Sequence, residues 1–245
     1  MKKLTLLAGL SMAVISSPSA FAAKEYQVVE VSHGGSISGK VSFTGNDPAP
    51  LVFKIAKDND VCGDGNREID YVRVNNGALT EVVVYLDKIN QGKAFNEAEK
   101  EASIVQKGCK FVPYMQIMHN DNNAVIVNED PVMHNIHTYE IIGKAKKTVM
   151  NMSQPDKGTI NKNVELKRGV GMKVECDAHD FMHGFVFVAK NPYYALVAED
   201  GSYSIDNIPA GKYKVMAFHG TLGTEKGSAD VSAGASQTVD FSFSE

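Results

Sequence analysis

After its first residues, the sequence lacks any apolar run long enough to form a membrane-spanning helix. It also lacks an excess of basic residues, because 25 Lys and Arg stand against 29 Asp and Glu, a formal net charge of −4. A mildly acidic chain has no broad electrostatic attraction for nucleic acid. The sequence contains no phosphate-binding loop, and its "EDGSYSIDNIP" segment offers Ser and Asp without a paired His, which is typical of a turn. We therefore expect no membrane span, no nucleic-acid partner and no hydrolase site.

The first 22 residues have the pattern of a secretory signal peptide. "MKK" supplies positive charge, residues 4–15 are apolar, and Ala20 and Ala22 form a small-x-small cleavage site before Ala23. No twin-Arg precedes the apolar stretch, and no Cys stands at the cleavage point to carry a lipid. We therefore expect a soluble protein exported to the periplasm.

Cysteine is scarce: the chain has only Cys62, Cys109 and Cys176. In an oxidising compartment two of the three are expected to pair and one to be left over. Cys62 and Cys109 lie in Gly-flanked, loop-like settings, whereas Cys176 ends a strand-like run beside His179. We expect a Cys62–Cys109 disulfide, which would stabilise the fold by about 4 kcal/mol in the chain-entropy model, and a Cys176 thiolate. The alternative is that all three are buried free thiols.

The alternation of apolar and polar residues predicts an all-β fold. Period-two runs recur along the chain, separated by turn residues: "SISGKVSF", "EVVVYL", "NAVIVN", "NVELK", "GMKVEC", "HGFVFVA", "GSYSIDNI", "KYKVMAF" and "QTVDFSF". Many short strands with frequent turns favour sandwiches or barrels over helical folds. The one helix candidate, residues 96–102, is short and polar all round, so a surface turn or linker suits it better.

The segment "VECDAHDFMHGFVFV" spaces three soft or borderline metal ligands three residues apart: Cys176, His179 and Met182. Upstream, "NEDPVMHNIHTYEI" places His134 in a loop after the strand-like run "NAVIVN". A blue-copper centre needs two imidazoles and a thiolate in a plane, with a weak axial thioether. His134, Cys176, His179 and Met182 supply that set, with the last three on one loop between two strands.

"CDAHDFMHG" together with "MHNIH" resembles the cupredoxin (blue-copper) family, in particular its amicyanin- and plastocyanin-like branches, over residues of roughly 103–190. The resemblance implies a Greek-key β-sandwich holding one copper ion that alternates between Cu(II) and Cu(I). It implies that Asn135 braces the ligand loop by hydrogen bonding. It further implies single-electron transfer with redox proteins such as a cytochrome or a dehydrogenase. Four protein ligands leave no open position for substrate, so we expect no enzymatic activity.

The two ends of the mature chain resemble a different module. "AEDGSYSIDNIPAGKYKVMAFH" and "GGSISGKVSFTG" are similar to the carboxypeptidase regulatory-like (transthyretin-like) β-sandwich. We therefore expect a signal peptide (1–22), a first part of the regulatory-like module (23–100), an inserted cupredoxin-like domain (101–190) and a second part of the module (191–245). The disulfide would then clamp module to insert. Two unrelated β domains in tandem are the alternative arrangement.

The other histidines receive separate interpretations. We expect His179 to be the exposed electron port, with Phe181 in an apolar ring around it that docks partners. Two residues beyond His134 on an extended backbone, His137 faces the other way and is not a ligand. We expect His183 to face solvent and His219 to be structural.

Two further features bear on function. "DNDVCGDGNREI" starts like a calcium loop, but Cys62 and Ile69 stand where oxygen ligands are required, so we expect no calcium site. Seven of the ten methionines lie between residues 115 and 182. They are interpreted as core residues, and the alternative is a Cu(I)-presenting surface, which would suit a periplasmic copper carrier or copper-tolerance protein. A third possibility is that the regulatory-like module binds a partner or the cell envelope, with copper subsidiary.

Overall fold

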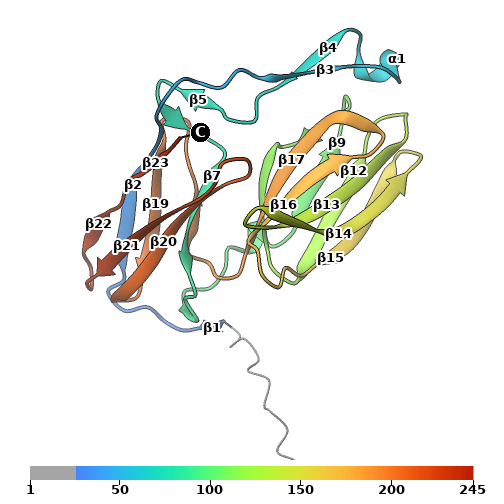
Figure 1. Cartoon of the computed structure of the whole chain (residues 1–245). Coiled ribbons are helices and arrows are strands. Elements are labelled where there is room, and N and C mark those ends of the chain that lie inside the picture. Colours follow the sequence, from blue (N-terminus) through green and yellow to red (C-terminus); the bar gives the residue numbers. More distant parts are fainter. Residues whose placement is uncertain (1–25, 245) are drawn as a thin grey trace, which may run out of the picture.

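The computed structural model describes residues 26–244, and nearly every regular element in this range is a β-strand (Figure 1). The predicted all-β fold class is confirmed. The strands form two sandwiches, which we call the terminal sandwich and the central sandwich. Within residues 26–244, no helix has the length and apolarity needed to cross a membrane. The signal peptide predicted for residues 1–22 lies outside the described residues.

The terminal sandwich combines strands from both ends of the described chain. One sheet has the order β18 (Tyr194–Leu196), β7 (Val82–Asp87), β20 (Gly211–His219) and β21 (Gly223–Val231). The other has the order β19 (Ser202–Ile208), β2 (Gly35–Phe43), β6 (Ala78–Leu79) and β5 (Val74–Asn75), and β22 (Ser236–Thr238) and β23 (Phe241–Phe243) also pair with β2. Antiparallel pairing of β7 with β20 and of β2 with β19 joins segments that lie on either side of the central sandwich in the sequence. The predicted boundaries near residues 100 and 190, and the likeness to a regulatory-like module, stay predictions.

The central sandwich lies between these segments in the chain. Its four-stranded sheet has the order β10 (Phe111–Val112), β9 (Ala102–Gln106), β12 (Asn122–Asn128) and β15 (Gly158–Val164). Its five-stranded sheet has the order β11 (Met115–His119), β17 (His179–Ala189), β16 (Gly171–Cys176), β13 (His134–Ile142) and β14 (Ala145–Gln154). Buried side chains from both sheets form one continuous core.

Strand β17 is buried on both faces because it lies between the core of the central sandwich and the terminal sandwich. Val186 and Val188 point into that core, whereas Phe185 and Phe187 alternate with them and pack with Phe218 of β20 in a second cluster. Alternation along a strand sends successive side chains to opposite faces. Glycine permits the close fit, since a Cβ on Gly171 would lie 2.3 Å from the Phe218 ring. This contact holds the two sandwiches against each other.

A hairpin excursion, residues 51–69, leaves the terminal sandwich and crosses one end of the central sandwich (Figure 1). We call it the strap. It comprises β3 (Leu51–Lys54), the short helix α1 (Asn59–Cys62) and β4 (Asn66–Ile69). Strands β3 and β4 pair with each other in a sheet of their own.

Two small elements complete the described chain. Strand β1 (Gln27–Val28) pairs in parallel with β8 (Gln91–Gly92). In residues 96–102, the one helix candidate of the sequence, the helical part is the 3-10 turn η1 (Glu97–Glu99), and Ala102 already begins β9. The Asn96 side chain caps that turn by accepting a hydrogen bond from the Ala98 backbone N–H.

Candidate metal centre

Three potential metal donors converge at one end of the central sandwich. His134 begins β13, Cys176 ends β16 and His179 begins β17, so the three stand on neighbouring, paired strands. The two ring Nδ1 atoms of His134 and His179 lie 3.1 Å apart, and the Cys176 Sγ lies 3.7 Å from the His179 Nδ1. All three side chains are buried. Residues separated by more than 40 positions are thus brought within contact distance.

Local structure explains why Cys176 and His179 lie together. They face each other in the register of β16 and β17, with only Asp177 and Ala178 between them. Met182 follows on β17 and is fully buried in the same core cluster as Cys176. The four residues that the sequence indicates as ligands therefore all lie in or beside one end of this core, and their role as ligands stays a prediction.

Each histidine has a carboxylate on its remote nitrogen. His134 Nε2 lies 2.8 Å from Asp130 Oδ2, and His179 Nε2 lies 2.9 Å from Asp58 Oδ2. Because an ionised carboxylate can only accept, each Nε2 carries the hydrogen, and in a neutral ring Nδ1 is then left with a lone pair. Burial lowers the pKa of His179, although the Asp58 hydrogen bond opposes this, so its neutral form is favoured. Such carboxylate–histidine pairs orient metal-ligating rings.

Asp130 is itself held firmly. Its Oδ1 accepts from the backbone N–H of Gly108 at 2.7 Å, and its Oδ2 accepts from that of Cys109 at 2.8 Å. Burial alone would raise the pKa of Asp130, but the hydrogen bonds from Cys109, His134 and Gly108 outweigh it and the pKa is lowered. The carboxylate therefore stays ionised and bonded to His134.

Neither carboxylate was assigned a role from the sequence. Asp130 had a signal, since it precedes His134 by four residues in "NEDPVMH". Asp58 had none, because it is 121 positions from His179 and belongs to the segment that only partly matches a calcium loop.

Asn135 braces the Cys176 turn, as the resemblance implied. Its backbone N–H donates to the Cys176 Sγ at 3.3 Å, and its side-chain oxygen accepts from the Asp177 backbone N–H at 3.2 Å. The Asn135 amide in turn donates to Asn151 on β14 at 2.5 Å. These bonds fix the sulfur between β13 and β16.

The prediction that His179 is an exposed electron port is wrong. The strap covers this end of the sandwich, and His179 is only 1 % exposed. Phe181, expected in an exposed apolar ring, is 2 % exposed and has the Arg67 guanidinium 4.8 Å above its ring. The solvent-facing position expected for His183 is also wrong, because its ring packs against Phe53 of the strap and against Tyr71.

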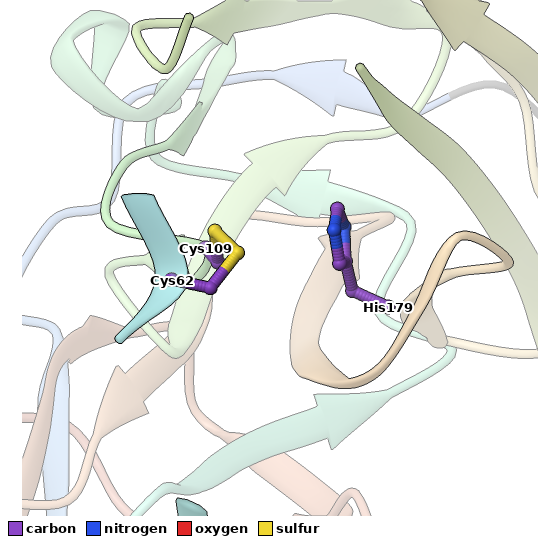
Figure 2. Close-up of side chains that lie close together, drawn as sticks. All are labelled: Cys62, Cys109 and His179. Atoms are coloured by element: carbon purple, nitrogen blue, oxygen red, sulfur yellow. A yellow bond between two sulfur atoms is a disulfide. The ribbon is translucent and has the colours of Figure 1, made fainter. Parts of the chain in front are cut away.

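The predicted Cys62–Cys109 disulfide is confirmed, and Cys176 is free and buried. The disulfide joins α1 of the strap to the turn before β10 and lies beside the His179 ring (Figure 2). Its sulfur atoms are within 4.8 Å of a His179 nitrogen, but they are bonded to each other and offer no thiolate. The disulfide thus ties the strap to the central sandwich at the metal centre.

The remaining histidines and methionines have other surroundings. His137 bonds to Asp177 and stacks on Tyr139 away from the three donors, while His219 is buried in the terminal sandwich. Of the seven methionines between residues 115 and 182, only Met133 is exposed. The others are buried or packed against the cores, which agrees with their interpretation as core residues.

Comparisons with known proteins give structural likeness only. No family model and no curated protein matches the chain. A purple cupredoxin from Nitrosopumilus maritimus shares 18% identity over 36% of this chain and 99% of its own, with a TM-score of 0.30. Amicyanin from Paracoccus versutus shares 15% identity over 43% of this chain and 97% of its own, with a TM-score of 0.29. A copper-containing nitrite reductase from Thermus scotoductus shares 15% identity over 61% of this chain and 28% of its own, with a TM-score of 0.28.

These neighbours are copper proteins, but TM-scores this low carry no argument about function.

Proposed function

We propose that this protein is a periplasmic blue-copper electron carrier that passes single electrons between redox proteins such as a cytochrome and a dehydrogenase. His134, Cys176 and His179 would hold one copper ion, and Met182 would supply a further, weaker thioether ligand. Imidazole, thiolate and thioether together make the donor set that suits copper in such sites. When bound, copper supplies a reversible one-electron couple, Cu(II)/Cu(I).

One observation carries the proposal: the Nδ1 atoms of His134 and His179 face each other at 3.1 Å with the Cys176 sulfur beside them. Because both Nε2 atoms donate to aspartates, the two facing nitrogens present lone pairs when the rings are neutral. Two lone pairs at that distance repel, and burial lowers the pKa of His179, which disfavours protonation of that ring. A bound cation relieves the repulsion, so the residues present fit a soft metal ion.

The surrounding residues would keep the site rigid. Asp130 and Asp58 hold the rings, Asn135 holds the sulfur, and paired strands hold the backbone on either side. Rigid donors change little when the charge of a bound ion changes, which favours fast electron transfer. Four protein ligands would also leave no open coordination position, so we infer a carrier and not an enzyme.

An absorption spectrum of the Cu(II)-loaded protein tests the proposal. We expect an intense thiolate-to-copper charge-transfer band and a reversible one-electron couple by voltammetry. The matched control is Cys176→Ser, which removes the thiolate at nearly constant volume and should abolish the band. A colourless Cu(II)-loaded wild-type protein contradicts the proposal.

A periplasmic copper carrier or copper-tolerance protein is the second candidate. The burial of His179 under the strap favours it, because a sealed site suits retention of an ion. The burial of most methionines weighs against a Cu(I)-presenting surface. Stoichiometry separates the two functions: more than one tightly held Cu(I), transferred to an acceptor protein, would support the copper carrier.

A further inference from the structure

The strap makes its closest polar contact with the proposed metal centre through Asp58. This residue occupies the N-cap position of α1 with a φ of 53°, a left-handed conformation that Asp adopts more readily than most residues. Aspartate at this position ordinarily caps a helix with its carboxylate. Here the side chain makes no cap hydrogen bond, and its Oδ2 accepts from His179 Nε2 at 2.9 Å instead. The carboxylate thus bonds to a residue of the proposed metal centre and does not cap its own helix.

Apolar side chains seal the same contact. Ile55 and Cys62 of the strap belong to the core cluster that contains Cys176, Phe181 and Met182. Phe53 and Val61 pack against that cluster from the strap side. The strap therefore completes the wall of the central core at this end.

Arg67 and the Cys62–Cys109 disulfide anchor the part of the strap that follows Asp58. The Arg67 guanidinium donates to the backbone carbonyls of Cys62 and Cys109 and lies over the Phe181 ring. Both anchors connect the strap to the turn at Cys109, whose backbone N–H also donates to Asp130. The strap that covers His179 and the Asp130 carboxylate that bonds His134 are thus both held by the turn at Cys109.

We propose that the strap is a latched cover of the metal centre, with Asp58 as the positioning residue that joins the cover to His179. The metal ion and small reagents then reach Cys176 and the two histidines only when the strap lifts. The proposal rests on the proposed function for its metal measurements, but the accessibility of Cys176 can be measured in metal-free protein.

The first experiment measures the rate at which iodoacetamide alkylates Cys176 in the metal-free protein with its disulfide intact. Asp58→Gly tolerates the positive φ and removes the carboxylate, and we expect at least about tenfold faster alkylation, since a hydrogen bond to a charged group is lost. Asp58→Asn keeps an acceptor oxygen and should show a smaller increase. The matched control is Asp60→Asn, which removes an exposed carboxylate from the same helix and should react as wild type does.

Two results overturn the cover. One is an Asp58→Gly rate equal to that of wild type, and the other is a wild-type rate as fast as that of the urea-unfolded protein. Thermal unfolding of each variant separates lifting of the strap from global unfolding. If Asp58→Gly does not fold, Asp58→Asn decides the question, and a rate equal to wild type then counts against the latch.

The second experiment follows the copper-loaded protein during its transfer of metal to a chelator. Loss of an outer carboxylate partner typically weakens metal binding by about 10- to 100-fold, so Asp58→Gly should release copper correspondingly faster, with Asp58→Asn in between. A shift of the charge-transfer band in Asp58→Gly, partly restored in Asp58→Asn, reports the changed His179 ring. If the wild-type protein shows the band but Asp58→Gly changes neither copper release nor Cys176 alkylation, the cover is refuted and the proposed function stands. If the copper-loaded wild type shows no band but Asp58→Gly still speeds alkylation of Cys176, the proposed function is refuted and the cover stands.

Discussion

Buried histidines in the two sandwiches differ in what faces their Nδ1 atoms. In the terminal sandwich, the Nδ1 of His219 accepts hydrogen bonds from the backbone N–H groups of Thr221 and Leu222. In the central sandwich, the Nδ1 atoms of His134 and His179 face each other and a thiol. A lone pair met by N–H donors stabilises a turn, whereas two lone pairs that face each other beside a single thiol favour a bound cation. The partner of Nδ1, more than burial, separates a structural histidine from a candidate ligand.

The largest expected difference between the two sandwiches is in how copper changes the free energy of unfolding of their histidine variants. At a free copper concentration 1,000 times Kd, a site that exists only in the folded state adds about 4 kcal/mol to the free energy of unfolding. We expect this gain in wild type and in His219→Asn, and its loss in His134→Ala, each measured against its own metal-free form by thermal unfolding. Retention of the gain in His134→Ala would remove the distinction drawn between the two regions.

Removal of Asp130 should have the next largest effect. Asp130→Ala leaves the backbone N–H groups of Gly108 and Cys109 and the His134 ring without their acceptor. We expect the metal-free protein to lose about 3 kcal/mol of stability in urea unfolding, since buried unsatisfied donors are costly.

Asp177 provides the matched control, because it forms an aspartate–histidine pair with His137 in a more exposed setting. Asp177→Ala should cost less than about 1 kcal/mol, the usual worth of an exposed pair. If Asp130→Ala and Asp177→Ala lose equal amounts of unfolding free energy, burial of the Asp130–His134 pair adds nothing to stability.

Acidification should act on the terminal sandwich through His219. Burial lowers the pKa of His219 to about 4, below the value near 6.5 of an unfolded chain. The unfolded state then takes up the proton first as the pH falls, so stability is full above pH 6.5 and is lost towards pH 4. The His219 contribution between pH 7 and pH 5 is a loss of about 2 kcal/mol.

His219→Asn places an amide oxygen near the Nδ1 position and does not titrate, so it should flatten this part of the pH dependence. Urea unfolding at a series of pH values measures the slope for both proteins. An unchanged slope in His219→Asn would mean that another group causes the acid sensitivity.

Much of the candidate site followed from local patterns. The three-residue spacing of Cys176, His179 and Met182 beside a strand-like run indicated a ligand turn, and the two Gly-flanked cysteines indicated the disulfide. The disulfide is confirmed, whereas the role of the three residues as ligands stays a prediction. Both follow from local patterns because alternation and turn chemistry act over a few residues. Asp130, four residues before His134, was equally local and could have been found.

The sequence by itself determined the all-β class and indicated the disulfide pairing and a set of candidate donors, since each rests on residue types within a few positions of one another. Only the tertiary structure decided that the strap crosses the central sandwich, that Asp58 bonds His179, and that His179, Phe181 and His183 are covered. The physical reason is that burial depends on which distant segment packs over a residue. The sequence around His179 does not predict that Asp58, on a hairpin 121 positions away, packs against it.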